Sequence, residues 1–289
     1  MSDIVQETHD LIKSKGFPYY PKDEKWRNNV YNQLMSFRRD TMIDHKNKVI
    51  GQSTHGLNLA WSYMEHAWDI RCGKMKTPME IWDDEEHLKK GINKILTGTF
   101  FKQKKPHDIT DSDMRSMLRR YSGTQMVSNF RPTAAAALYD IFVEKDSPLE
   151  GTSAGTVWDP SMGYGGRLLG AIAAGVNYIG TDPCIPTYDG LQGILNDFGN
   201  PHNTYQLHRQ GSETFIPEDE SLDFVFIDAD HSYNGVMRDV EAWAPKVRKG
   251  GMIIGHDIHF PTVKQAVEEL YGEGNYIVED DFLWLVEKQ

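Results

Sequence analysis

The chain has 289 residues, of which 39% are hydrophobic and 25% are charged, a balance that excludes fibrous, disordered and membrane-embedded proteins. No apolar run reaches the ~20 residues that a membrane-spanning helix needs, and the N-terminal residues lack the apolar core of a signal peptide. The two cysteines, Cys72 and Cys184, provide neither a disulfide framework nor a zinc motif. We therefore predict a cytoplasmic protein with no membrane partner.

The formal net charge of −11 is distributed unevenly along the chain. Residues 1–150 contain 23 Lys and Arg against 21 Asp and Glu, a net charge of +2, whereas residues 151–289 contain 8 against 21, a net charge of −13. So acidic a chain argues against a nucleic-acid partner. Nucleic acid nevertheless remains an alternative partner, because the basic residues of the first half could form one face that binds it. These residues are Arg38, Arg39, Lys102, Lys104, Lys105, Arg115, Arg119, Arg120 and Arg131. A solvated surface is the simpler interpretation of the same residues.

Apolar residues at helical spacing predict four helices in the first part of the chain, at residues 57–70, 78–96, 112–121 and 132–143. Asp111 or Ser112 can cap the third helix. Pro132 suits the first turn of the fourth, where its missing N–H costs no hydrogen bond. Residues 1–129 are therefore expected to form a helical N-terminal extension or cap.

The pattern changes after Gly151, where short β-rich segments alternate with helical ones. Strands are predicted at residues 156–159, 178–182, 204–209, 224–228, 252–256, 276–278 and 282–286, and helices at residues 167–174, 188–197, 236–247 and 262–271. Such alternation predicts a parallel sheet with helices on both faces. Only the last two strands are close enough to pair as an antiparallel hairpin. Residues 130–289 are therefore expected to form one doubly wound α/β domain with a mostly parallel, seven-stranded sheet.

A glycine-rich turn follows the first strand of this domain. The strand ends in Asp159, and Gly163 and Gly165 lie in the turn, where glycine permits positive φ and a close approach of the backbone to a ligand. The second strand ends in Asp182, 19 positions after Gly163, where a carboxylate can bind both hydroxyls of a ribose. The candidate cofactor-binding residues are Asp159, Ser161, Met162, Gly163, Tyr164, Gly165, Asp182 and Pro183.

The turn does not fit a dinucleotide. The position for the third glycine of the dinucleotide spacing is occupied by Leu168, and Asp159 would repel a pyrophosphate while attracting a sulfonium with an amino group. Residues 157–170 resemble motif I of the class I S-adenosylmethionine-dependent methyltransferases, and Asp182-Pro183 resembles their motif II. The resemblance implies S-adenosylmethionine as cofactor and a sheet with a terminal antiparallel hairpin. It also implies that Gly211 and Ser212, after the third strand, approach the adenine.

Acids and histidines gather at the ends of the fourth and fifth strands. In this fold the two strands are neighbours, about 4.8 Å apart, so their ends place Asp228, Asp230, His231, His256 and Asp257 around one opening. Carboxylates so close repel one another unless something neutralises them. A divalent cation, the sulfonium cofactor in contact with Asp228, and mutual hydrogen bonds are three solutions.

Residues 223–270 resemble the magnesium-assisted sugar O-methyltransferases of macrolide pathways. This resemblance implies that Asp228 and Asp257 hold Mg²⁺, with His256 at a position that is a carboxylate or histidine in the family, and that His231 is the general base. Asp228 and Asp230 are the further catalytic candidates. A metal would lower the pKa of an alcohol, which is otherwise a poor nucleophile, and His231 would accept its proton. The implied acceptor is a small molecule.

A competing resemblance covers the junction before the sheet. Residues 128–133, the helix that follows and residues 159–167 resemble the motif X to motif I order of DNA amino-methyltransferases, a style shared by bacteriophage-type methylase-like proteins. It implies that Thr133 helps to hold the methionine end of the cofactor. The chain departs from that family after the fourth strand, where Asp228-Ala-Asp-His231 replaces the Asp/Asn/Ser-Pro-Pro-aromatic sequence that grips a flipped base.

Three functions remain open from the sequence. The leading hypothesis is a methyltransferase that acts on a hydroxyl oxygen, with or without Mg²⁺ assistance. The alternative is a nucleic-acid methyltransferase that acts on a base or a modified nucleotide and binds through the basic N-terminal half. A non-catalytic module that only binds the cofactor is the third. The sequence indicates neither the acceptor nor the oligomeric state.

Overall fold

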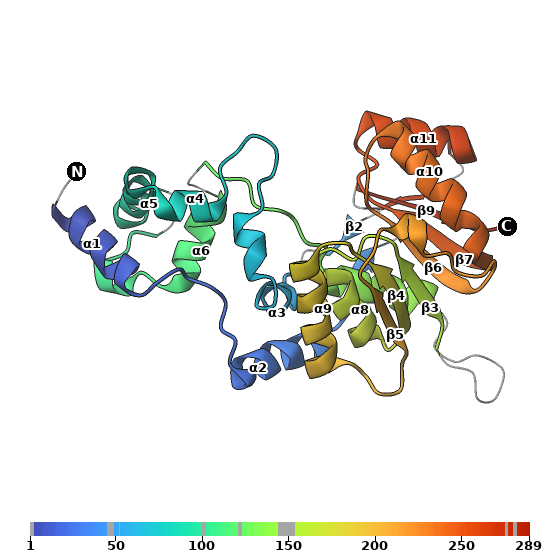
Figure 1. The fold of residues 1–289 in the computed structure, drawn as a ribbon, viewed down its shortest axis with the longest axis horizontal. Helices are drawn as coiled ribbons and strands as arrows, with labels where there is room; N and C mark the ends of the chain where they lie inside the picture. Colours follow the sequence, from blue (N-terminus) through green and yellow to red (C-terminus); the bar gives the residue numbers. More distant parts are fainter. Residues whose placement is uncertain are drawn as a thin grey trace. The chain divides into compact units, whose positions relative to one another are not determined.

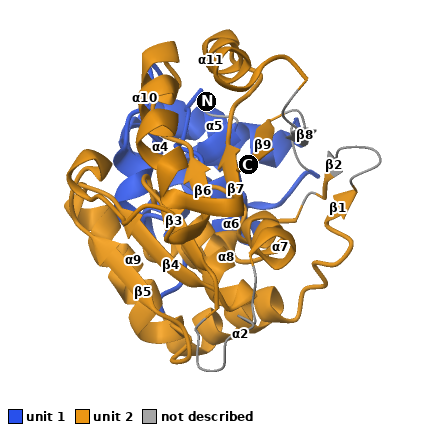
Figure 2. Cartoon of the chain, turned by 90° about the vertical axis from the view of Figure 1, so that its right-hand side faces the viewer, with its two compact units in different colours: residues 1–22, 64–128 blue, residues 23–63, 129–289 orange. Residues whose placement is uncertain are grey.

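The computed structural model describes residues 3–44, 49–51, 53–99, 102–120, 123–143, 154–274, 277–279 and 282–289. The chain divides into two compact units (Figure 2). Unit 1 comprises residues 1–22 and 64–128, and unit 2 comprises residues 23–63 and 129–289. Unit 2 is therefore discontinuous in sequence, and it includes the segment 23–63 that helical periodicity alone assigns to an N-terminal extension.

Unit 1 consists of helices in its described residues: α1 (Asp3–Ser14), α4 (Pro78–Asp83), α5 (Glu85–Thr97) and α6 (Asp111–Arg120), with 3-10 turns at Glu65–Asp69 and Pro106–Asp108. Trp68, Ile92 and Met117 are fully buried among them. The predicted helix 78–96 is in fact two helices, because Asp84 ends α4 and its carboxylate accepts the backbone N–H of His87 at 3.1 Å as the N-cap of α5. The last residue of the predicted helix 112–121 lies outside the described residues.

A seven-stranded sheet forms the centre of unit 2 (Figure 1). Its strands are β3 (Thr156–Asp159), β4 (Asn177–Thr181), β5 (Tyr205–His208), β6 (Leu222–Ile227), β7 (Val247–Gly255), β8 (Ile277–Glu279) and β9 (Leu283–Glu287). Their order is β5-β4-β3-β6-β7-β9-β8, and all neighbours are parallel except β7 with β9 and β9 with β8. This arrangement confirms the predicted mostly parallel sheet with an antiparallel C-terminal strand pair. Residue 276 of the predicted sixth strand lies outside the described residues.

Helices cover both faces of the sheet. They are α7 (Pro132–Phe142), α8 (Gly166–Ala174), α9 (Ile185–Phe198), α10 (Tyr233–Trp243) and α11 (Pro261–Tyr271). Val225 and Ile253 of the sheet pack with buried residues of α10 and α11. Phe224, the neighbour of Val225, points to the other face, where its ring meets Tyr139 of α7 at 5.1 Å. Successive residues of one strand therefore pack against opposite helical layers, as a doubly wound fold requires.

The segment 23–63 packs within unit 2 through α2 (Glu24–Met35), α3 (Leu57–Trp61) and the short strands β1 (Ile43–Asp44) and β2 (Val49–Ile50). The predicted helix 57–70 ends as a helix at Trp61 and resumes only as the 3-10 turn from Glu65. Arg27 explains the break, because its guanidinium donates to the carbonyl of Ser62 at 2.9 Å and to the hydroxyl of Ser62 at 3.2 Å. A continuing helix would need that carbonyl for its own ladder.

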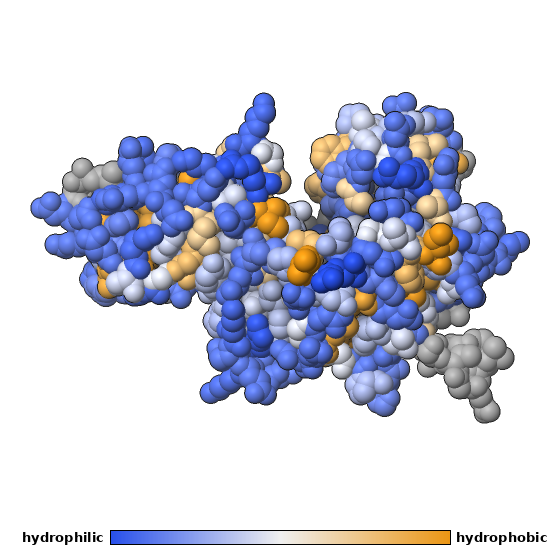
Figure 3. All heavy atoms as spheres, viewed as in Figure 1, coloured by the Kyte–Doolittle hydropathy of each residue, from blue (hydrophilic) through white to orange (hydrophobic). Residues whose placement is uncertain are grey.

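Within the described residues, no helix combines the length and the apolar character needed to cross a bilayer. Hydrophilic side chains predominate on the face shown in Figure 3, with smaller apolar areas between them. This surface is the one expected from a composition in which a quarter of the residues are charged.

Candidate active site

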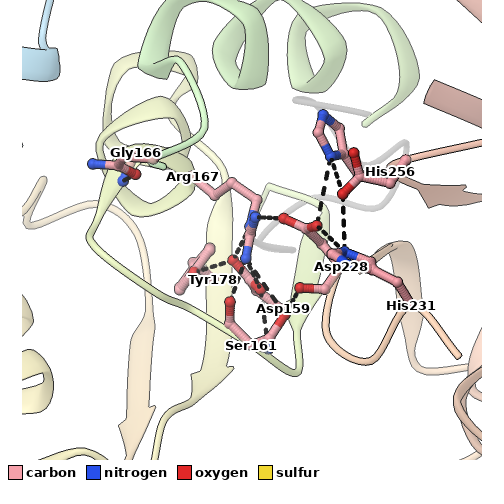
Figure 4. Close-up of polar contacts among 10 residues, drawn as sticks. Asp159, Ser161, Gly166, Arg167, Tyr178, Asp228, His231 and His256 are labelled. Atoms are coloured by element: carbon pink, nitrogen blue, oxygen red, sulfur yellow. Dashed lines mark hydrogen bonds and ion pairs between the residues drawn. The ribbon is translucent and has the colours of Figure 1, made fainter. Parts of the chain in front are cut away.

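The carboxyl ends of β3, β4, β6 and β7 bring the predicted site residues to one edge of the sheet. Asp159 ends β3, Asp182 follows β4, Asp228 follows β6, and His256 and Asp257 follow β7. Ligands of doubly wound sheets bind at this edge. Figure 4 shows Asp228, His231 and His256 on one side of Arg167, with Asp159, Ser161 and Tyr178 around its guanidinium.

The glycine turn between β3 and α8 is held open by left-handed backbone conformations. Gly163 has φ +55° and Gly165 has φ +84°. A Cβ on Gly163 would meet only the carbonyl of Ser161, at 3.7 Å, so the space above this turn is open to a ligand. A Cβ on Gly166 would lie 1.8 Å from the carbonyl of Phe130, so Gly166 is required by the close approach of another backbone segment.

Asn129 clamps this turn, and sequence reasoning did not identify it. Its side-chain oxygen accepts the backbone N–H of Gly166 at 3.1 Å, and its side-chain nitrogen donates to the carbonyl of Tyr164 at 3.0 Å. Orphan N–H groups at a helix start need such partners. Asn129 lies in the stretch 128–133 that resembles motif X, but that resemblance implies a role for Thr133 and not for Asn129.

Arg167 is the central cation of the site. Its Nε lies 2.7 Å from Oδ2 of Asp159, and the same guanidinium pairs with Oδ2 of Asp228 and donates to the carbonyl of Ser161. The side chain is 6% exposed. Burial opposes its charge, but Asp159 and Asp228 raise the pKa of Arg167 above its ordinary value. An arginine in the first turn of a helix is disfavoured by the helix dipole, so its position after the glycine turn could have signalled an acidic partner.

Asp159 is fully buried beneath Arg167. The hydroxyl of Tyr178 donates to its Oδ2 at 2.6 Å, and the backbone N–H of Ser161 donates to its Oδ1 at 3.2 Å. With these partners Asp159 organises the end of β3. It does not face solvent, where the predicted contact with the cofactor would be made.

The carboxylate of Asp228 connects the arginine to the two histidines. Oδ2 pairs with Arg167, whereas Oδ1 lies 3.6 Å from Nδ1 of His256 and 3.9 Å from Nε2 of His231. Burial opposes ionisation, but Arg167, His231 and His256 together lower the pKa of Asp228 below its ordinary value. The hydroxyl of Ser161 donates to the backbone carbonyl of Asp228 at 2.9 Å and ties β6 to the glycine turn.

Asp257 lies between the two imidazoles. Its Oδ2 is 2.9 Å from Nε2 of His231 and 3.1 Å from Nδ1 of His256, and its backbone adopts φ +60°. The side chain of His231 is 45% exposed. Hydrogen bonding to Asp228 and the charge of Asp257 raise the pKa of His231 above its ordinary value. Donor atoms of Asp228, His231 and Asp257 lie within 4.8 Å of one another and form a set suited to a metal, and Nδ1 of the predicted ligand His256 lies 3.6 and 3.1 Å from the same two carboxylates.

Asp230 turns away from this cluster. Its carboxylate accepts the backbone N–H and the hydroxyl of Ser232, both at 2.9 Å, at the start of α10. The side chain is exposed. Asp230 therefore shapes the loop after β6, and the structure does not bring it together with the other predicted catalytic residues.

The remaining predicted cofactor residues divide into exposed and buried ones. Asp182 is partly exposed, and its carboxylate accepts the backbone N–H of Cys184 at 2.8 Å and that of Gly163. Burial raises the pKa of Asp182. Pro183 is exposed, Tyr164 is partly exposed with its ring 5.5 Å from that of Trp61, and Gly211 and Ser212 are partly exposed at the start of the 3-10 turn after β5.

Met162 and Thr133 are buried instead. Met162 packs beneath β4, where a Cβ on Gly180 would meet its side chain at 2.4 Å. Thr133 is fully buried, and its hydroxyl is 3.5 Å from the carbonyl of Ser53. Neither side chain is accessible to a ligand in this conformation. The open turn at Gly163 and the acid at Asp182 nevertheless fit an adenosine with a small, cationic substituent. At Gly163 a ligand can approach the backbone closely, and the carboxylate of Asp182 offers oxygens that can bind a ribose.

One family model matches part of this chain. Residues 155–258 match the family model described as a methyltransferase domain. No curated protein sequence matches the chain.

Several solved structures are similar to part of this chain at low sequence identity. A methyltransferase from Geobacter sulfurreducens is 13% identical, with a TM-score of 0.43 over 56% of this chain and 79% of that one. An rRNA methylase from Streptococcus thermophilus is 15% identical, with a TM-score of 0.39 over 56% of this chain and 99% of that one. TrmN from Thermus thermophilus is 14% identical, with a TM-score of 0.40 over 55% of this chain and 49% of that one.

Proposed function

We propose that this chain, an S-adenosylmethionine-dependent methyltransferase with a class I domain in its C-terminal half, transfers the methyl group to a hydroxyl oxygen with His231 as general base. One observation carries the proposal. The half-exposed imidazole of His231 is paired with Asp257 at 2.9 Å, at the same edge of the sheet as the open glycine turn.

The pairing suits a base. Nε2 of His231 lies 2.9 Å from Oδ2 of Asp257, and among the described residues Nδ1 has no hydrogen-bond or ion-pair partner, which leaves it to accept a proton. Asp257 orients the ring and stabilises the imidazolium that forms, as the acid of a His–Asp pair does. The sulfonium of the cofactor supplies the methyl group: a C–O bond forms to the acceptor as the C–S bond breaks.

Arg167 offsets the repulsion among the carboxylates that the sequence places at the strand ends. Three acids, Asp159, Asp228 and Asp257, lie near one another, and repulsion among them calls for a cation. The guanidinium of Arg167 pairs with the first two, and the imidazoles of His231 and His256 pair with the third. Arg167 therefore supplies part of the neutralising charge from within the protein, and a neutral His231 remains able to act as base.

Magnesium assistance is the second mode, and it rests on the donor set Asp228, His231 and Asp257. Carboxylate oxygens suit Mg²⁺, and a bound cation would lower the pKa of the acceptor hydroxyl. In that mode His231 is a ligand and has no free role as base. With this donor set the two modes exclude each other, and metal removal distinguishes them. A site at Asp228, His256 and Asp257 would instead leave His231 as base.

A small acceptor is favoured over nucleic acid because several basic residues of the predicted face have partners within the protein. Arg39 pairs with Asp140 at 2.7 Å, and Lys104 pairs with Asp113 at 2.6 Å. Arg115 donates to the carbonyl of Pro18 at 3.1 Å. Arg119 stacks over the ring of Trp68, and Arg131 donates to the carbonyl of Gly51.

The test is a product analysis. The protein is incubated with methyl-labelled S-adenosylmethionine and a panel of phenols, sugars, nucleosides and duplex DNA, and fragmentation mass spectrometry locates the methyl group. We expect an O-methyl product from a small acceptor and its loss in His231→Ala. A methyl group on nitrogen or carbon, or a wild-type rate in His231→Ala, contradicts the proposal. Transfer to DNA alone supports the nucleic-acid alternative.

A further inference from the structure

Two phenylalanines stand exposed beside the proposed base. Phe260 precedes α11 and is 40% exposed, and Phe282 precedes β9 and is 45% exposed. Exposed apolar rings beside polar groups commonly mark a ligand-binding surface. The mechanism proposed above uses neither ring.

The backbone brings the two rings to the same place. The left-handed conformation of Asp257 turns the chain after β7, and the N–H of Phe260 then donates to the carbonyl of Asp257 at 2.9 Å. The N–H of Ile258 donates to the carbonyl of Phe282 at 3.1 Å. Both phenylalanines are thereby fixed to the short loop that carries Asp257.

Three imidazoles continue this aromatic surface. His231 stacks on Phe260 with ring centroids 5.3 Å apart and an interplanar angle of 21°. His256 stacks on Phe282 at 6.2 Å and 17°. His259 bridges the pair, with its centroid 4.4 Å from that of Phe260 and 4.9 Å from that of Phe282. The proposed base is therefore one ring of an aromatic cluster, and the cluster exposes ring surface next to it.

The polar surroundings indicate what this surface suits. A sugar presents several hydroxyls and needs several hydrogen-bonding side chains, but one nitrogen of each imidazole is turned toward Asp257, at 2.9, 3.1 and 3.7 Å, which leaves at most one nitrogen per ring for a ligand. A phosphate is disfavoured by charge, because unit 2 contains 16 Lys and Arg against 29 Asp and Glu, a net charge of −13. An uncharged planar ring needs neither and gains from stacking.

We infer that Phe260 and Phe282 form a stacking platform that selects an uncharged, planar aromatic acceptor and presents its hydroxyl to His231. The inference rests on the proposed function, since it names the acceptor class for that same site. The two phenylalanines are specificity-determining residues in it, and His259 supports their faces.

Two matched probes test the platform, catechol and trans-cyclohexane-1,2-diol. Both carry adjacent hydroxyls, but only catechol is planar. Binding is measured by saturation-transfer-difference NMR with the full chain saturated with S-adenosylhomocysteine. We expect a signal from catechol and none from the saturated diol. Phe260→Leu and Phe282→Leu retain apolar volume but lose the ring face, so each is expected to weaken catechol binding roughly two- to tenfold. Ile141→Ala, at a residue 47% exposed on α7, is the control and is expected to change nothing.

The outcomes separate the platform from the chemistry. Equal signals from both diols, no signal from either, or unchanged catechol binding in both Leu variants overturns the platform. Thermal stabilisation by S-adenosylhomocysteine in each variant confirms that folding and the cofactor site are intact. Catechol binding that depends on Phe260 while the methyl group arrives on a ring carbon supports the platform and overturns oxygen transfer. O-methylation of both diols at equal rates supports oxygen transfer and overturns the platform.

Discussion

Arg167 and Asp159, eight residues apart on opposite sides of the glycine turn, form a buried ion pair in which Nε and Oδ2 are 2.7 Å apart. The pair closes the turn onto the end of β3. Because Arg167 also reaches Asp228, the residue after β6, one guanidinium couples the proposed cofactor side of the site to the proposed catalytic side.

Removing the arginine is expected to cost more than removing the whole pair. Arg167→Met leaves the fully buried Asp159 without its cation, and breaking a buried pair on one side costs about 3–5 kcal/mol. Arg167→Met combined with Asp159→Asn leaves no buried charge at this position and is expected to recover part of that loss. Urea denaturation of Arg167→Met, of Asp159→Asn and of the double variant measures the free energy of unfolding of each. A double variant that is destabilised by the full sum of both single ones contradicts the coupling.

Asp182 is expected to govern cofactor affinity without governing stability. Its carboxylate lies beside the open glycine turn, and removing a charged hydrogen-bond acceptor costs about 1.5–3 kcal/mol. Asp182→Asn should therefore weaken S-adenosylhomocysteine binding by roughly 10- to 100-fold in calorimetric titration. Asp189→Asn, an exposed position on α9, is the matched control. Wild-type affinity in Asp182→Asn would remove Asp182 from the cofactor site.

The rate of methyl transfer is expected to rise with pH through the titration of His231. A general base acts in its neutral form, and Asp228 and Asp257 raise the pKa of His231, so the imidazole stays protonated to higher pH than usual. The acidic limb of the profile should consequently lie above the ordinary histidine value of about 6.5. Asp257→Asn should move that limb to lower pH. A profile that is flat between pH 5 and pH 8, or an unmoved limb in Asp257→Asn, contradicts the assignment.

Metal removal decides between the two proposed modes. If His231 is the base and Arg167 supplies the neutralising charge, dialysis against EDTA leaves the rate of methyl transfer unchanged. Loss of turnover that Mg²⁺ restores identifies the donor set Asp228, His231 and Asp257 as a metal site. His256→Ala separates the ligand sets, because His256 belongs to the set implied by family resemblance and not to the set Asp228, His231 and Asp257.

The sheet could be predicted because its determinants are local. Each central strand is a short apolar segment bounded by turn residues, and the acids at 159, 182 and 228 follow directly from the strand ends. The helix boundaries in the first part of the chain depended on distant or polar contacts instead. Arg27 binds Ser62, 35 residues away, where the helix stops after Trp61, and Asp84 interrupts the predicted helix 78–96 by capping.

The sequence predicted which residues gather at this edge of the sheet better than it predicted the contacts of each residue. Spacing identified Asp228, His231 and Asp257, because parallel strand ends meet at one edge. It could not show that Arg167 would neutralise two of the acids, that Asp230 would turn to Ser232, or that Thr133 would be buried. Those outcomes depend on side-chain direction and on the packing of Asn129 and Phe130 against the turn, which no local pattern encodes.

The discontinuous course of unit 2 has a consequence for the order in which the protein folds during synthesis. Residues 64–128 and their partners in residues 1–22 are complete once residue 128 has been made, so unit 1 can fold early. Residues 23–63 must wait, because Arg39 pairs with Asp140 and Arg27 with Asp197, which is 170 residues further along the chain. Unit 2 is therefore completed by contacts between residues far apart in the sequence. A protein that begins at residue 130 would lack residues 23–63, which complete this unit.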